Sequence, residues 1–129
     1  MDDRREAARI RQELVDAAQR AESVRARVIV DAFVAEARRR GLPTVPLEAT
    51  LLDGRRVKTN RVGWYVNRAQ SVAIGDDGAW YNLLVAGSPL ARWRGVSVEP
   101  SDPPLVVGLG GRDGESGDLQ EFLDRVLDG

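Results

Sequence analysis

The chain has 129 residues, of which 43% are hydrophobic and 30% are charged, and it contains neither cysteine nor histidine. This length suits one domain, so we expect residues 1–129 to fold around a single core. The missing Cys and His exclude thiolate zinc sites, iron–sulfur clusters and ordinary haem ligation. They also exclude a Ser-His-Asp triad and a cysteine nucleophile.

Charge and hydropathy limit the partners and the location of the protein. The 19 basic and 20 acidic residues leave a net charge of −1, so the chain as a whole has no electrostatic attraction for nucleic acid. No stretch is apolar for long enough to span a bilayer, and the first residues lack the apolar core of a secretory signal. Because no cysteine is present to form a disulfide, we expect a cytoplasmic protein without membrane contact.

Residues 1–40 contain no Gly and no Pro, whereas all 13 glycines and all 6 prolines lie at or after position 41. This asymmetry predicts a helical arm over residues 1–40 and a β-rich body over residues 41–129. Gly41 and Pro43 are suited to end the helix. Apolar residues recur in the arm at intervals of three and four and so share one helix face; they are Ile10, Leu14, Ala17, Ala21, Val24, Val28, Ala32 and Ala35.

The length of this arm indicates a partner. A single helix of about 37 residues would be roughly 55 Å long, whereas the rest of the chain should form a body only about 30 Å across. Residues 28–35 are apolar nearly all round, as in a buried segment, but the first half has only a narrow apolar seam. We expect a second molecule to cover that seam at Ile10, Leu14, Ala17, Ala21 and Val24. The alternatives are a bend near Ser23, a first half folded back on the body, or fraying.

The body contains short apolar runs separated by turn residues, the pattern of an antiparallel meander; the runs are residues 62–66, 71–74 and 79–85. Weaker strands are expected around residues 56–60 and 91–98, with an edge strand at 105–107. Asp118 and Glu121 have the spacing of a capping box, which predicts a C-terminal helix over 118–128. The predicted fold class is therefore α+β, with a long N-terminal helix, a sheet of about four to six strands and a short C-terminal helix.

The meander predicts two apolar faces, because side chains alternate along a strand; they carry Trp64, Ile74 and Trp80 on one side and Tyr65, Ala73 and Tyr81 on the other. One face should receive the long helix. The C-terminal helix, another subunit or a ligand would cover the second. A face bearing Trp64, Trp80 and Trp93 would suit a small apolar or planar molecule, although core packing is the commoner role of such residues.

The glycine-rich loop from Gly108 to Gly117 precedes the C-terminal helix, as phosphate-binding loops do. However, Asp113 stands where a G-x-G-x-x-G register requires glycine, and the only lysine of the chain is Lys58. The acids of the loop would repel phosphate and lack the spacing of a calcium loop. We expect a flexible connection and a helix cap at Asp118 or Ser116, with no metal or cofactor.

No other cluster specifies chemistry. The basic residues at 38–40 and 55–61 could hold single-stranded nucleic acid, but residues 41–129 have 9 basic against 12 acidic residues, which favours a charged strand edge. Asp76 and Asp77 fit a hairpin tip. We therefore expect a non-catalytic protein–protein interaction module, of adaptor or chaperone type, that forms a homo-oligomer. The alternatives are a small-molecule-binding domain and, less favoured, a single-stranded nucleic-acid binder.

Overall fold

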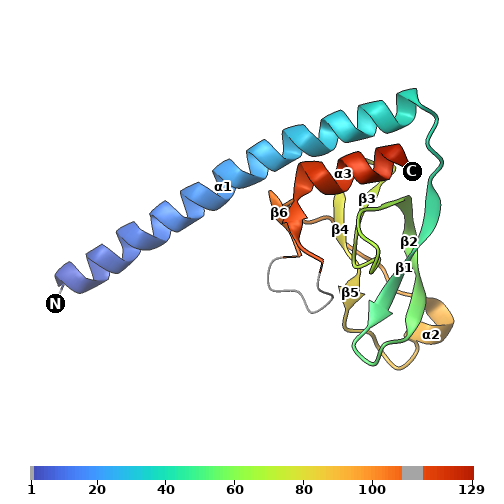
Figure 1. Ribbon diagram of the computed structural model, residues 1–129. Coiled ribbons are helices and arrows are strands. Elements are labelled where there is room, and N and C mark those ends of the chain that lie inside the picture. The colour runs from blue at the N-terminus through green and yellow to red at the C-terminus, as the bar shows by residue number, and fades with distance from the viewer. Residues whose placement is uncertain (1, 109–114) are drawn as a thin grey trace.

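The computed structural model describes residues 2–108 and 115–129 and confirms the predicted α+β fold (Figure 1). A long N-terminal helix leads into a small sheet, and a short C-terminal helix returns beside the first. The elements are α1 (Asp2–Arg39), β1 (Val45–Leu51), β2 (Arg56–Tyr65), β3 (Val72–Gly75), β4 (Trp80–Asn82), β5 (Leu84–Val85), α2 (Ala91–Arg94), β6 (Val106–Val107), β7 (Gly117–Asp118) and α3 (Leu119–Asp128).

The helical arm is one continuous helix, α1, without a break near Ser23. It ends as its sequence predicts, because Gly41 adopts a left-handed conformation with φ of +69°. The Gly41 amide donates to the Arg38 carbonyl at 3.1 Å, and the Leu42 amide donates to the Ala37 carbonyl at 2.9 Å. These two bonds form a Schellman motif, which satisfies two of the carbonyls left free at the end of the helix.

The main sheet has the strand order β4-β3-β2-β1-β5. Strands β1 to β4 pair antiparallel, and β5 pairs in parallel with β1. The predicted meander register is confirmed, since Trp64 lies opposite Ile74 and Ile74 lies opposite Trp80. The weak strand expected at 56–60 is the beginning of β2 rather than a separate strand.

The sheet rolls onto itself because β4 and β5, which lie at its two opposite edges, are separated only by Leu83. The Thr50 amide of β1 donates to the Leu83 carbonyl at 2.7 Å and so holds the residue between the two edge strands against β1. The face expected to need a separate cover is therefore the interior of the roll. Its buried residues are Leu47, Ala49, Leu51, Val57, Ala73, Tyr81, Leu83, Ala91 and Val98.

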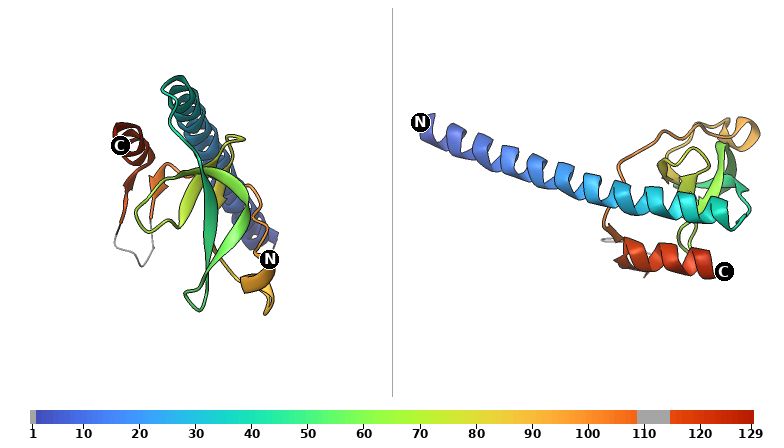
Figure 2. Two further views of the ribbon diagram at one scale, coloured as in Figure 1. Left: turned by 90° about the vertical axis from the view of Figure 1, so that its right-hand side faces the viewer. Right: turned by 90° about the horizontal axis from the view of Figure 1, so that it is seen from above.

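Helices α1 and α3 cover the other face of the sheet, where Trp64, Ile74 and Trp80 lie. Helix α3 lies beside the C-terminal half of α1 (Figure 2, right). Phe33 of α1 meets Trp64 edge to face, with ring centroids 5.6 Å apart, an arrangement that the ring quadrupoles favour. The α1 residues buried in this layer are Ala26, Val30, Phe33, Val34 and Ala37.

The body differs from the sequence prediction in three places. The sequence does not predict strand β1, because Pro46 and Glu48 interrupt its apolar pattern. The register of β1 against β2 shifts between these two residues, and Pro is tolerated at such an irregularity. The strand expected at 91–98 is the four-residue helix α2 followed by a single bridge from Val96 to Thr59. The strand at 105–107 exists as β6, but it pairs with β7 in a separate two-stranded sheet.

The glycine-rich loop is described only in part. Residues 109–114, with Asp113 among them, lie outside the described residues. Asp118 occupies the N-cap position of α3, but its side chain makes no capping hydrogen bond. Glu115 instead joins this region to the turn between β2 and β3, accepting from the Arg68 amide at 3.3 Å and the Ala69 amide at 3.1 Å.

Candidate protein–protein interface

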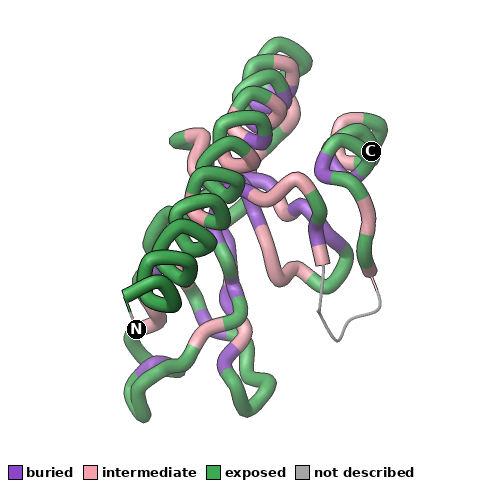
Figure 3. The backbone as a smooth tube through the Cα atoms, turned by 90° about the vertical axis from the view of Figure 1, so that its left-hand side faces the viewer, coloured by how far each residue is buried: buried purple, intermediate pink, exposed green. Residues whose placement is uncertain are grey.

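The predicted interface residues of α1 are all exposed. The exposed fraction is 47% for Ile10 and 65% for both Leu14 and Val24, and Ala17 and Ala21 are also exposed. Residues 2–21 are exposed throughout except for half-buried Asp16 (Figure 3). This part of α1 extends beyond the body (Figure 2, right). The first half of the helix is thus neither folded back nor covered by the described part of the chain.

The exposed seam continues past the point where α1 reaches the body. Val28 is 65% exposed, and Ala32 and Ala35 are exposed as well. The expectation that residues 28–35 are buried all round is therefore wrong. At 3.6 residues per turn, Val28 lies about 160° around the helix from buried Ala26. The apolar seam and the body thus occupy opposite sides of α1.

Glu22 marks the place where α1 leaves the body. Its carboxylate accepts the Leu105 amide at 3.1 Å, which ties the helix to the segment between α2 and β6. The Ser101 amide in the same segment donates to the Trp80 carbonyl at 2.9 Å. Contacts with the body thus hold α1 from Glu22 to its C-terminal end. The residues before Glu22 project as a rod.

A groove of about 530 Å³ borders the seam at this exit point. Val24 and Val28 form one wall, and the hairpin and the proline-containing segment form the other; the remaining lining residues are Ser23, Arg27, Ala79, Pro100, Ser101, Asp102 and Pro103. The sequence gives no local sign of this groove, because its two walls are more than fifty residues apart in the chain. It enlarges the apolar surface available to a partner of α1.

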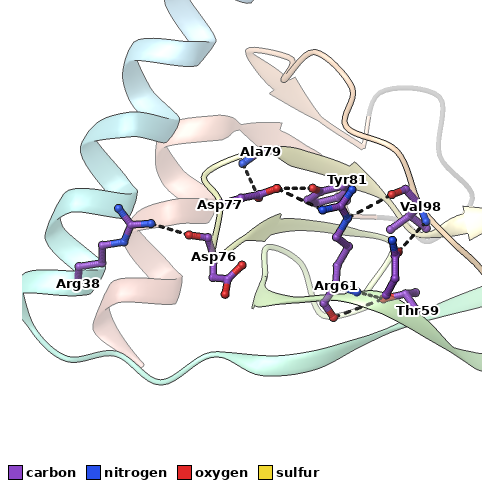
Figure 4. Close-up of polar contacts among 9 residues, drawn as sticks. Arg38, Thr59, Arg61, Asp76, Asp77, Ala79, Tyr81 and Val98 are labelled. Atoms are coloured by element: carbon purple, nitrogen blue, oxygen red, sulfur yellow. Dashed lines mark hydrogen bonds and ion pairs between the residues drawn. The ribbon is translucent and has the colours of Figure 1, made fainter.

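A second arrangement of polar groups lies at the β3–β4 hairpin (Figure 4). The Tyr81 hydroxyl donates to Asp77 Oδ2 at 2.6 Å, and the Ala79 amide donates to Asp77 Oδ1 at 3.0 Å. Arg61 Nη1 lies 3.6 Å from the Asp77 carboxylate, and the Arg61 guanidinium carbon lies 5.0 Å from the centre of the Tyr81 ring. Asp77 is therefore more than the hairpin-tip residue that its sequence indicates.

The pKa values of this cluster argue for a structural role. Burial and the hydrogen bond to Asp77 raise the pKa of Tyr81 to about 12. Burial opposes ionisation of Asp77, but the hydrogen bonds from Tyr81 and Ala79 and the charge of Arg61 outweigh it and lower the pKa of this carboxyl. Near neutral pH the phenol thus remains protonated and the carboxylate ionised, so neither group is poised to exchange a proton.

The three tryptophans do not share one surface. Trp64 and Trp80 are only 6% and 1% exposed and lie in the layer between the sheet and the helices. The Trp64 indole donates to the Leu42 carbonyl at 3.2 Å. Trp93 lies instead on α2, is 74% exposed and has the Arg92 guanidinium 5.0 Å from its ring centre. The rings expected to form a ligand-binding face are therefore divided between the core and a distant helix.

The two basic clusters are also separate, and acidic neighbours pair with their arginines. Arg39 and Arg40 both bind Glu36, at 2.5 and 2.7 Å, and these bonds lower the pKa of Glu36 to about 2. In the sheet, Arg56 lies 3.5 Å from Glu48, and Arg61 lies beside Asp77. Both clusters thus take part in ion pairs within the chain.

The described ranges, 2–108 and 115–129, contain neither a metal-binding cluster nor a membrane-spanning helix. Within them no group of three or more acidic side chains lies close enough together to hold a metal ion. Within the same ranges no helix combines the length and the hydropathy needed to cross a membrane. The exposed seam of α1 and its adjoining groove remain the candidate functional surface. No family model, curated protein or solved structure matches the chain.

Proposed function

We propose that this chain is a non-catalytic protein interaction module that associates with a second copy of itself through the exposed seam of α1. One observation carries the proposal. Apolar residues repeat every three and four positions over nearly three heptads of a helix that projects from its body, and each of them is exposed. Such a repeat is the pattern by which two helices pair in water.

The location of the seam supports the same function. A helix that served only its own fold would bury its apolar stripe against the body, as Val30 and Phe33 do. The seam lies on the opposite side of α1, so the body does not cover it. Association with another helix removes this surface from water and keeps α1 straight.

The chain offers a matched pair of variants that test the proposal. Leu14 lies in the seam, whereas neighbouring Val15 is 49% exposed but lies about 100° away around the helix. Leu14→Glu and Val15→Glu introduce the same charge with similar helix propensity. Only the Leu14 variant places an unpaired carboxylate in the proposed contact, which should weaken association at least about tenfold.

Size-exclusion chromatography with light scattering provides the measurement. The wild-type chain and Val15→Glu should have twice the 14.1 kDa mass of one chain at micromolar concentration, and Leu14→Glu should approach the mass of a monomer. A wild-type monomer at these concentrations would refute the proposal. Equal association of the two variants would also refute it, since the seam would then not be the contact.

A further inference from the structure

We infer that the two α1 helices pair antiparallel, in a register that sets Leu14 of one copy opposite Ala17 of the other. This inference rests on the proposed self-association and adds its geometry. In the heptad notation, seam positions a are residues 7, 14, 21 and 28, and positions d are residues 10, 17 and 24. Antiparallel helices pair each a residue with a d residue of the partner. In this register the two residue numbers add to 31.

The sizes of the seam residues fit this register. Leu14 meets Ala17 of the second copy, Ile10 meets Ala21, and Val24 meets Ala7, so three of the four large seam residues lie opposite an alanine. Val28, the fourth, lies opposite Asp3 at the end of the contact. Alternating large and small residues across a contact lets the two surfaces interdigitate. In a parallel pair the same positions face themselves, which sets Ala17 against Ala17 and Ala21 against Ala21 and leaves these layers poorly filled.

The charges beside the seam select the same arrangement. Glu13 and Arg20 occupy flanking g positions, and in this register each Glu13 faces Arg20 of the other copy, so that two opposite-charge pairs form. Shifting the antiparallel register by one heptad sets Glu13 against Glu13 or Arg20 against Arg20. A parallel pair sets Arg20 against Arg25. Like charges at these positions are unfavourable. The inferred register also sets Arg4 against Arg25 of the other copy, away from the centre of the contact. Of the four arrangements it is nevertheless the only one that gives both Glu13 and Arg20 a partner of opposite charge.

The second flanking pair contributes less. The register also brings Glu6 to Arg27 of the other copy, but Arg27 already binds Asp31 at 2.8 Å and the Gly78 carbonyl. Glu6 is likewise bonded to Arg9 at 2.8 Å. We therefore assign the charge selectivity to Glu13 and Arg20, which lie nearest the two-fold axis of the pair.

The groove beside Val24 and Val28 is consistent with this geometry. Because Ala7 of the second copy lies opposite Val24, the first turns of that helix pass along the groove and cover its apolar wall. The body lies on the other side of α1 and leaves the seam accessible. The antiparallel pair thus accounts for the seam and the groove with one occupant, a second copy of the chain.

Disulfide trapping tests the register directly, because the natural chain has no cysteine. Ala7→Cys and Val24→Cys are made as separate variants, mixed, and oxidised. The inferred pair predicts only heterodimers that join position 7 to position 24, identified by mass spectrometry. A parallel pair predicts homodimers that join 7 to 7 and 24 to 24. As a control, Val15→Cys, which lies outside the seam, should not cross-link efficiently.

Charge exchange gives an independent readout. Arg20→Glu should weaken the inferred dimer about tenfold in Kd, because two attractive pairs become repulsive, and Glu13→Arg/Arg20→Glu together should restore it. In a parallel pair Arg20→Glu would instead strengthen association by removing repulsion from Arg25. If light scattering shows a dimer but the cysteine variants give homodimeric cross-links, or no cross-links, the register is wrong and the proposed self-association still stands. A wild-type monomer would overturn the proposed function as well.

Discussion

The Tyr81 hydroxyl donates to the Asp77 carboxylate across 2.6 Å, from a ring that is fully buried inside the rolled sheet. Asp77 lies in the β3–β4 turn and also accepts the Ala79 amide. Tyr81 is therefore a link between the interior of the roll and the hairpin beside α1. Because Arg38 donates to the Asp76 carbonyl at 2.5 Å, the same hairpin is also tied to the end of the helix.

The raised pKa of Tyr81 predicts a late ionisation that is measurable in a Tyr65→Phe background, where Tyr81 is the only tyrosine. The absorbance of tyrosinate near 295 nm should rise with a midpoint near pH 12 rather than near the ordinary value of 10.0. Asp77→Asn in the same background should lower the midpoint without restoring 10.0, since burial, the larger cause, remains. A midpoint of 10 before the mutation would mean that the ring is not buried.

The same shift makes the folded state sensitive to alkali. A pKa raised on folding means that the unfolded chain loses the proton first. The contribution of Tyr81 to stability is therefore complete below pH 10 and is lost as the pH rises from 10 to 12. Urea midpoints should fall across this interval, and Tyr81→Phe should remove this part of the fall. A Tyr81→Phe variant with an unchanged profile would assign alkaline unfolding to another group.

The orientation of α1 predicts unequal effects at two valines that are two residues apart. Val30 is fully buried and Val28 is 65% exposed. Val30→Ala should lower the free energy of unfolding by about 2 kcal/mol because it leaves a cavity, whereas Val28→Ala should change it by less than about 0.5 kcal/mol. Urea unfolding at a concentration that keeps the chain monomeric measures both. Equal losses would place the body on a different face of α1.

The fold was predictable wherever local signals determine it. The absence of Gly and Pro before position 41 indicates a single helix, and Gly41 ends it by adopting a positive φ. The turn at 67–70 and Gly78 in the next turn set the meander register, so the pairing of Trp64 with Ile74 and of Ile74 with Trp80 follows from short-range turn chemistry. Each of these features depends on residues near one another in the chain.

The features that the sequence does not reveal depend on distant contacts. The parallel pairing of β1 with β5 joins Thr50 to Leu84, more than thirty residues away, and no local pattern indicates it. This pairing rolls the sheet and buries Tyr81. The face of α1 is ambiguous for a related reason, since two apolar stripes run along the helix and only the position of the body shows that Phe33, not Val28, faces inward.

The candidate interface illustrates the same division. The residues from Ile10 to Val24 were identifiable from spacing alone, because a helical repeat is local. The groove was not, since Val24, Pro100 and Ala79 line it together only after the chain has folded. The polar link between Asp77 and Tyr81 was likewise hidden, because a turn containing two aspartates already has a sufficient local explanation.

The close approach of β3 to Gly63 predicts that any side chain at this position lowers the stability of the fold. A Cβ atom at this position would lie 2.1 Å from the Ile74 carbonyl oxygen and 2.7 Å from the Gly75 Cα atom, so Gly63→Ala must force β2 away from β3. We expect a loss of about 3 kcal/mol or more. Gly41→Ala is the matched control, because nothing lies within 4 Å of its added Cβ atom and only its positive φ is unfavourable, at about 1 kcal/mol. Urea unfolding should separate the two variants clearly. If Gly63→Ala were as mild as Gly41→Ala, the β2–β3 contact would have to be looser than the observed register requires.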